Sequence, residues 1–181
     1  MAFIMAKEVF WCSSCLNMST RPRITFDQEG RCNACQWSDE KKTFNWKERE
    51  EELKKNLKKY TNASDNYKVI VPVSGGKDGS YIAHKLKSDY GVEPLCVTVR
   101  PPLETKIGQE NVYNFVSSGF SHVHVSPDEE AMAALNKYGF IEKGFPYYGW
   151  LICIHTAVLQ IAKRFNIGLI FYAEDLSLIH I

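Results

Sequence analysis

The sequence predicts an α/β domain built on a doubly wound, mostly parallel sheet, preceded by a small cysteine-rich segment. Short apolar runs alternate with helical patterns from residue 67 to residue 175, as is typical of parallel strands joined by helices. The first of these runs breaks directly into a glycine-rich turn that opens a helix. Two Cys-x-x-Cys pairs lie ahead of this region.

Composition limits the class of protein. The chain has 181 residues, of which 45% are apolar, and this is enough to bury one core. Its 22 basic and 21 acidic residues leave a net charge of +1, so no overall field attracts nucleic acid or an anionic membrane. No apolar stretch approaches the roughly 18 residues of a membrane span, and no secretion signal opens the chain. We therefore expect a cytoplasmic protein.

The cysteine-rich segment, residues 1–45, is predicted to form a zinc ribbon. Its two pairs are separated by sixteen residues: Cys12 with Cys15, and Cys32 with Cys35. Four thiolates at this spacing can hold one Zn²⁺ tetrahedrally, which we favour over a redox or disulfide role. Between the pairs we expect a short hairpin that turns at residues 27–30. So small a segment buries little apolar surface, so the metal would supply much of its folding free energy.

Residues 46–66 predict a charged helix and a polar linker. Apolar side chains recur on one face of the helix: Trp46, Leu53, Leu57 and Tyr60. We interpret it as a solvated helix that packs along this stripe, with a tRNA-binding helix as the alternative. The domain boundary is placed in the polar residues 61–66.

The glycine-rich turn, SGGKDGS at residues 74–80, is the strongest functional signal. It follows the apolar strand 69–73 and leads into a helix from residue 78. Glycines let several backbone N–H groups converge where the helix N-terminus adds its positive end, so we expect an anion there. Lys77 adds a charge, and the hydroxyls of Ser74 and Ser80 can donate to the same oxygens. The alternative is a glycine-rich turn without a ligand.

The rest of the domain predicts three further strands, at 94–99, 121–125 and 167–172, joined by helices at 104–118, 127–138 and 150–165. Several side chains here have a structural and a functional interpretation. His122 and His124 fit a polar strand face better than a ligand pair. Cys153, in an apolar helix, fits a buried small residue better than a nucleophile. The aromatic stretch 145–150 would shape the lip of a pocket.

The loop resembles the PP-loop (SGGxDS) of the ATP pyrophosphatases, which cleave ATP between its α- and β-phosphates. Gly79 stands at the serine of that motif, which leaves Ser80 to supply the hydroxyl. The order of cysteine pairs, charged helix, VSGGKDGSY, VTVRPPLETKIGQENVYNF and IGLIFYAED is similar to that of the N-acetyl sugar amidotransferases of bacterial surface-glycan synthesis, over residues 9–175. That family's GEN at the end of strand four is Ala173-Glu174-Asp175 here, so only Glu174 matches.

The resemblance implies a HUP-like, PP-loop ATP-binding domain at residues 67–175 that adenylates the N-acetyl oxygen of a sugar or sugar nucleotide. Ammonia then replaces that oxygen, and AMP and pyrophosphate leave. The product would be an acetamidino sugar for lipopolysaccharide O-antigen or pseudaminic acid. ATP, Mg²⁺ and Zn²⁺ are the implied cofactors, and a separate glutaminase subunit would supply ammonia because this chain has no recognisable glutaminase triad.

The same resemblance implies the site residues. Lys77, Asp78 and Glu174 would be catalytic. The resemblance aside, acidic groups at the carboxyl end of strand four could hold Mg²⁺ or orient a nucleophile. Because ligands of doubly wound sheets bind beyond the carboxyl ends of the strands, residues 98–100 would contact adenine or ribose, with plain strand core as the alternative. The expected nucleotide-binding residues are Ser74, Gly75, Gly76, Lys77, Asp78, Gly79, Ser80, Thr98 and Arg100.

Two other classes of protein stay open. One is a PP-loop tRNA thiolation enzyme in which Cys96 or Cys153 carries sulfur, although the near-neutral charge weighs against it. The other is a truncated, non-catalytic nucleotide-binding module. The chain ends in LSLIHI soon after strand four, so we expect residues 176–181 to be a non-native or truncated tail, with the domain incomplete.

Overall fold

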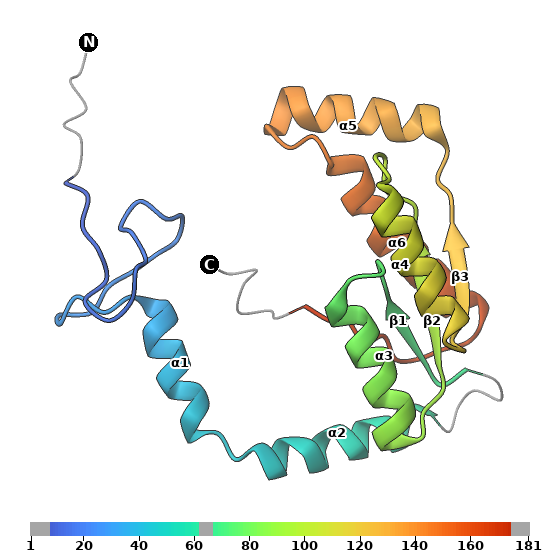
Figure 1. Ribbon diagram of the computed structural model, residues 1–181, viewed down its shortest axis with the longest axis horizontal. Coiled ribbons are helices and arrows are strands. Elements are labelled where there is room, and N and C mark those ends of the chain that lie inside the picture. The colour runs from blue at the N-terminus through green and yellow to red at the C-terminus, as the bar shows by residue number, and fades with distance from the viewer. Residues whose placement is uncertain (1–7, 62–66, 175–181) are drawn as a thin grey trace. The chain divides into compact units, whose positions relative to one another are not determined.

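A computed structural model describes residues 8–61 and 67–174 (Figure 1). Residues 62–66 of the predicted linker at 61–66, Asp175 and the predicted tail at 176–181 lie outside the described residues, and Thr61 is the last residue of α2. The helices and strands follow one another as α1 (Asn33–Thr43), α2 (Trp46–Thr61), β1 (Val69–Pro72), α3 (Lys77–Tyr90), β2 (Pro94–Val99), α4 (Lys106–Ser117), β3 (Ser121–Val125), α5 (Glu129–Lys143) and α6 (Tyr148–Arg164).

The described residues divide into two compact units, one ending at Glu51 and the other running from Glu52 to Glu174. In the first unit, Phe26 forms an antiparallel bridge with Cys32, and the Asp27 N–H donates to the Arg31 carbonyl, 3.0 Å away. The predicted hairpin and its turn are therefore confirmed. Helix α1 begins directly after Cys32, a feature that the cysteine spacing does not reveal. The predicted domain bounds at 1–45, 46–66 and 67–175 stay a prediction.

Helix α2 buries one part of its predicted stripe. Leu57 is 4% exposed and Leu53 packs beside it in the core of the second unit. Trp46 is 59% exposed, so its predicted place on the buried stripe is wrong. Its ring instead packs edge to face on Phe44, with the centroids 5.6 Å apart, which draws it toward the turn that precedes the helix.

The sheet of the second unit is parallel, in the order β1-β2-β3, which confirms the predicted α/β class. On the other side of β1, Ile170 forms a parallel bridge with Ile70. The chain therefore extends the sheet in one direction and then returns to the opposite side of β1, as a doubly wound fold requires. Among the described residues, the segment predicted as the fourth strand, 167–172, pairs with β1 through this isolated bridge. The paired part is therefore shorter than predicted.

Helices cover both faces of the sheet, and the strands alternate between two cores. One core joins the sheet to α2, α3 and α4 and contains Leu57, Val69, Val71, Ala83, Leu86, Cys96 and Phe115. The other joins it to α6 and contains Ile70, Leu95, Val97, Val158, Ile161 and Ala162. The parallel pairing of β1 with β2 places the carboxyl ends of the strands at one edge, where the glycine-rich loop begins.

Helix α5 extends past its predicted end at residue 138 to Lys143, and Gly144 closes it at φ +66°. The intervening Gly139 is a packing residue. A Cβ added to it would lie 2.2 Å from the Cβ of Tyr148, so the glycine allows α5 and α6 to approach closely. None of the described helices combines the length and the apolar character needed to cross a membrane.

Candidate functional site

The glycine-rich loop connects β1 to α3 at the carboxyl edge of the sheet. Gly75 adopts φ +78°, and Gly76 is the N-cap of α3 in an extended conformation. No side chain caps this helix end, so the first-turn N–H groups are available to a ligand. The predicted succession of strand, loop and helix is confirmed, and it has the geometry of an anion site.

Two glycines in the loop are required by close contacts. A Cβ on Gly75 would lie 2.9 Å from the backbone nitrogen of Val112 in α4. A Cβ on Gly79 would lie 2.8 Å from the carbonyl oxygen of Pro72. The second contact gives a physical reason for the departure from the PP-loop motif at position 79, because a serine there would push α3 away from β1.

The polar side chains of the loop lie at its mouth. Lys77 and Asp78 form an ion pair of 2.5 Å between Nζ and Oδ1, with side chains 87% and 64% exposed. The Ser80 hydroxyl donates to the Gly76 carbonyl across 2.8 Å. Lys77 and Asp78 are thus free to rearrange around a phosphate, whereas Ser80 must give up a helix contact to do so. Ligand contacts for these residues stay a prediction.

A cavity of about 600 Å³ opens beside the loop, within the range of small-molecule sites. It lies between α4 and the carboxyl ends of β2 and β3. Three residues predicted to contact a nucleotide, Ser74, Thr98 and Arg100, line it. The other lining residues are Val99, Pro101, Leu103, Glu104, Thr105, Gly108, Gln109, Val112, Tyr113, Val116, His122, His124, Ser126 and Trp150.

A hydrogen-bond chain links this cavity to the start of the loop. The buried Thr98 hydroxyl donates to the Val73 carbonyl across 2.7 Å, and its oxygen lies 2.8 Å from His122 Nε2. Burial, and then the nearby His124, lower the pKa of His122 below its ordinary value. As predicted, both histidines lie on one face of β3. That face lines the cavity, which the prediction did not include.

The mouth of the cavity is formed by charged and aromatic groups. Arg100 Nε donates to Glu104 across 3.2 Å, and its guanidinium also lies 3.5 Å from Glu129. The indole N–H of Trp150 donates to the Val99 carbonyl at 3.5 Å. Within the aromatic stretch 145–150, Trp150 is the residue that lines the cavity.

Glu174 is exposed and follows the Ile170 bridge by four residues. It does not line the cavity, and the segment that leads to it pairs with β1 on the side opposite β2. Its carboxylate and that of Asp78 are both open to solvent, as a Mg²⁺ site formed with substrate phosphates needs.

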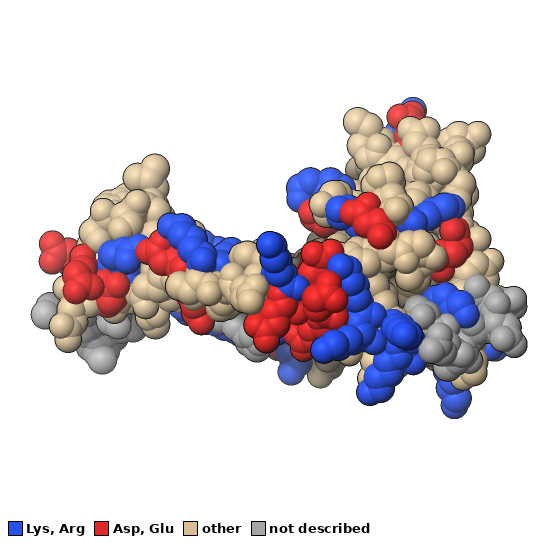
Figure 2. Space-filling view, turned by 90° about the horizontal axis from the view of Figure 1, so that it is seen from below, with Lys and Arg blue, Asp and Glu red and all other residues tan. Residues whose placement is uncertain are grey.

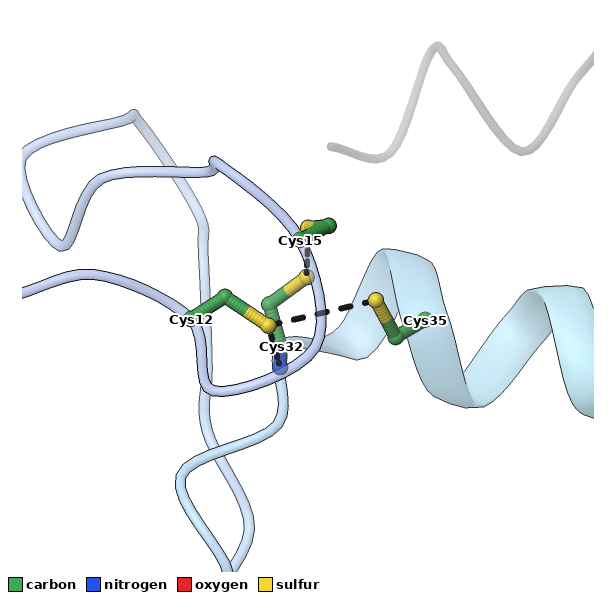
Figure 3. Close-up of side chains that lie close together, drawn as sticks. All are labelled: Cys12, Cys15, Cys32 and Cys35. Carbon is green, nitrogen blue, oxygen red and sulfur yellow. Dashed lines mark hydrogen bonds between the residues drawn. The ribbon is translucent and has the colours of Figure 1, made fainter.

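The cysteines of the first unit form a compact cluster (Figure 3). The four sulfur atoms lie within 4.8 Å of one another. Cys12 Sγ is 3.9 Å from Cys35 Sγ, and Cys15 Sγ is 3.6 Å from Cys32 Sγ. Tetrahedral ligands at a Zn–S distance of about 2.3 Å stand about 3.8 Å apart. The predicted cysteines are brought together in an arrangement that fits zinc.

Electrostatics at this cluster favour bound thiolates. Burial raises the pKa of Cys12, but N–H donors from Cys32, Ser14 and Cys15 outweigh burial and lower it to about 6. A hydrogen bond that the Cys35 thiol donates to Cys15, followed by burial, raises the pKa of Cys35 to about 12, because neighbouring sulfurs resist another negative charge. A divalent cation among the four would remove that repulsion.

The remaining cysteines are not arranged for nucleophilic chemistry. Cys96 is fully buried in β2, and burial raises its pKa to about 12. Cys153 is half-buried in α6, and burial raises its pKa too. Both therefore favour the neutral thiol, and neither lines the cavity.

Surface charge follows the balanced composition. On the face shown in Figure 2, Lys and Arg side chains lie next to Asp and Glu side chains.

Sequence reasoning missed the α4 and β3 side of the cavity. Val112 and His122 come from elements interpreted as a plain helix and a polar strand face. Val112 packs against Gly75 of the loop, and His122 lies within hydrogen-bond distance of Thr98. His122 is the second residue of β3, so the rule that ligands bind at the carboxyl ends of parallel strands does not point to it.

The fold and site define a parallel α/β domain with an open glycine-rich loop beside a ligand-sized cavity, joined in one chain to a four-cysteine cluster. Among solved structures, the chain is similar to a predicted subunit of tRNA methyltransferase from Methanocaldococcus jannaschii DSM. The two share 24% identity, the match covers 60% of this chain and 53% of that chain, and the TM-score is 0.42. It is also similar to NMN synthetase from Francisella tularensis, with 15% identity, 70% and 53% covered, and a TM-score of 0.45.

The chain spans about half the length of these two solved structures. No family model and no curated protein matches it.

Proposed function

We propose that the protein is an ATP-dependent amidotransferase that activates the N-acetyl group of a sugar or sugar nucleotide and exchanges its oxygen for ammonia. The loop at 74–80 is the observation that supports ATP use. It connects a buried strand to an uncapped helix end and borders a cavity of nucleoside size. The sequence resemblance supports the sugar as substrate.

The reaction is an adenylation followed by a substitution. The acetyl carbonyl oxygen attacks the α-phosphorus of ATP, and the bond from that phosphorus to the pyrophosphate oxygen breaks. Ammonia then adds to the imidate carbon, AMP leaves with the former carbonyl oxygen, and loss of a proton gives the amidine. Loop N–H groups and Lys77 would stabilise the charge that develops on pyrophosphate. No covalent enzyme intermediate is needed, which agrees with the absence of an activated cysteine among the described residues of the site.

Residues in and near the loop would have different roles in the reaction. Lys77 and Asp78 would separate from their ion pair, the first to contact phosphate and the second to hold Mg²⁺. Glu174, on the other side of β1, would orient the acceptor or the ammonia. When bound, Mg²⁺ would neutralise phosphate charge as pyrophosphate departs. Thr98 and Arg100 would contact adenosine from the cavity.

The proposed setting follows from the chemistry. Ammonia is scarce as the free base near neutral pH, so a separate glutaminase subunit would deliver it. The acetamidino product would enter lipopolysaccharide O-antigen or pseudaminic acid synthesis, and the enzyme would work in the cytoplasm on soluble sugar nucleotides.

A tRNA thiolation enzyme is the less favoured alternative. It needs a cysteine that carries sulfur as a thiolate, whereas Cys96 is inaccessible and both Cys96 and Cys153 have raised pKa values.

A nucleotide-binding module without catalysis is the third candidate, and it would bind ATP without forming AMP.

Replacing Lys77 or Asp78 with alanine is expected to weaken ATP binding about tenfold to a hundredfold, because a charge-assisted contact is worth about 1.5 to 3 kcal/mol. Calorimetric titration with MgATP measures this. Lys85→Ala and Asp89→Ala are matched controls, since these residues form an exposed ion pair at the far end of the same helix. Equal affinities for wild type and both loop variants would place the nucleotide elsewhere.

With an N-acetylated sugar nucleotide, MgATP and ammonium, the full-length protein is expected to form AMP and pyrophosphate. Separation of nucleotides by ion exchange distinguishes AMP from ADP, and mass spectrometry detects the amidine as a loss of about 1 Da when oxygen is replaced by NH. ADP as the product contradicts the PP-loop interpretation. AMP that forms only with tRNA and a sulfur donor favours the thiolation enzyme.

A further inference from the structure

We propose that His122 selects the purine that enters the cavity, by presenting an unprotonated Nδ1 to the amino group of adenine. The inference rests on the proposed use of ATP and goes beyond it, since the phosphate loop contacts parts common to all nucleoside triphosphates. His122 would be a specificity-determining residue on β3, an element to which the sequence assigns no role in binding.

The hydrogen bonds of Thr98 determine which ring nitrogen carries the proton. The Thr98 hydroxyl has one hydrogen and donates it to the Val73 carbonyl, which can only accept. Toward His122 the same oxygen must therefore accept, so Nε2 carries the hydrogen at this 2.8 Å contact. In the neutral ring, Nδ1 is then an acceptor.

The residue that carries this acceptor lies on the face of β3 that borders the cavity. His122 lines the cavity, and among the described residues no hydrogen bond is made to its Nδ1. In the register of the parallel pair, His122 lies beside Cys96, whose side chain packs in the core shared with α4. The imidazole is thus held between the sheet and α4, with one nitrogen engaged by Thr98 and the other open.

The walls around His122 suit a planar heterocycle. Val112 and Val116 of α4 provide apolar surface, and Trp150 provides an aromatic face whose indole N–H is already bound to Val99. The other lining residues include polar groups such as Gln109 and Ser126, so the discrimination expected from one acceptor is modest. The lowered pKa of His122, caused first by burial and then by His124, favours the neutral ring that this role needs.

Thr98 also ties base selection to the phosphate loop. Its donation to Val73 fixes the residue that directly precedes Ser74, and Val73 N–H in turn donates to Val97 across 2.9 Å. The orientation of the imidazole and the entry of the loop therefore share the hydroxyl of one buried residue, Thr98, which is 5% exposed. A base that satisfies Nδ1 would sit in register with phosphates held at the loop.

The test compares ATP with purine riboside triphosphate, which lacks the 6-amino group and keeps every other ring atom. Wild type is expected to bind ATP about three- to tenfold more tightly, the worth of one neutral hydrogen bond. His122→Gln places an amide near the Nε2 position, keeps donation to Thr98 and leaves no acceptor at the Nδ1 position, so the ratio should fall to about one. His122→Asn loses the bond to Thr98 but can place an oxygen near Nδ1, so its ratio should be intermediate.

His84→Gln, at an exposed position of α3 outside the cavity, is the matched control and should keep the wild-type ratio. Nitrogen NMR of the unmodified protein gives a readout that needs no variant and no nucleotide, and it should show His122 with hydrogen on Nε2. Hydrogen on Nδ1, a wild-type ratio of one, or an unchanged ratio in His122→Gln would each overturn the inference while leaving ATP use intact. Failure of wild type to bind either nucleotide overturns the proposed function and this inference together.

Discussion

Removing zinc is expected to unfold the ribbon while the α/β unit stays folded. In the first unit, from residue 8 to Glu51, the buried side chains are those of Cys12 and Cys32, at 7% and 0% exposure. Helix α1 buries no side chain at all. With no apolar core to hold it, this unit depends on the metal, and structural zinc sites supply about 10–16 kcal/mol of apparent binding free energy.

The measurement combines metal analysis with hydrogen exchange. Purified protein should contain close to one equivalent of zinc, and a strong chelator or a Cys12→Ser, Cys32→Ser double variant should abolish amide protection in the ribbon. Amides of β1 and β2 should keep theirs, because their cores lie in the other unit. Cys153→Ser is the control for the loss of a cysteine outside the cluster. Unchanged ribbon protection without metal would contradict the zinc assignment.

Much of the fold could be predicted because local signals agreed with tertiary structure. Strand 94–99 and strand 121–125 have the bounds predicted from their apolar runs, and the glycine-rich turn lies between a strand and a helix as expected. The predicted bounds were wrong where a tertiary contact determines where a helix ends. Gly139 indicates a helix end by itself, but it lies inside α5 because Tyr148 needs the space.

The candidate site was predictable where its residues are contiguous. The seven loop residues and the paired cysteines carry their spacing in the sequence, and the structure brings each set together. The cavity was only partly predictable, because it joins Thr98 of β2 to His122 of β3 and to Val112 of α4. No local pattern specifies that a threonine hydroxyl will bridge two strands, since the bridge depends on register.

Gly75→Ala is expected to reduce ATP affinity by more than tenfold, with Gly91→Ala as its matched control. Both glycines have left-handed backbones, at φ +78° and +63°, so an alanine at either site costs about 1–2 kcal/mol of backbone strain. A Cβ on Gly91 would meet nothing within 4 Å, whereas one on Gly75 would lie 2.9 Å from the backbone nitrogen of Val112. The difference between the two variants therefore isolates the contact with α4.

Relieving that contact requires the loop to move away from α4, which turns its N–H groups from the point where they converge on phosphate. Urea unfolding should show Gly75→Ala less stable than Gly91→Ala by about 1–3 kcal/mol, the usual cost of overpacking. Calorimetry should show ATP affinity unchanged in Gly91→Ala and lost in Gly75→Ala. If both variants bind ATP like wild type, the converging N–H groups of this loop do not hold the phosphates, and the anion site must be sought at another part of the sheet edge.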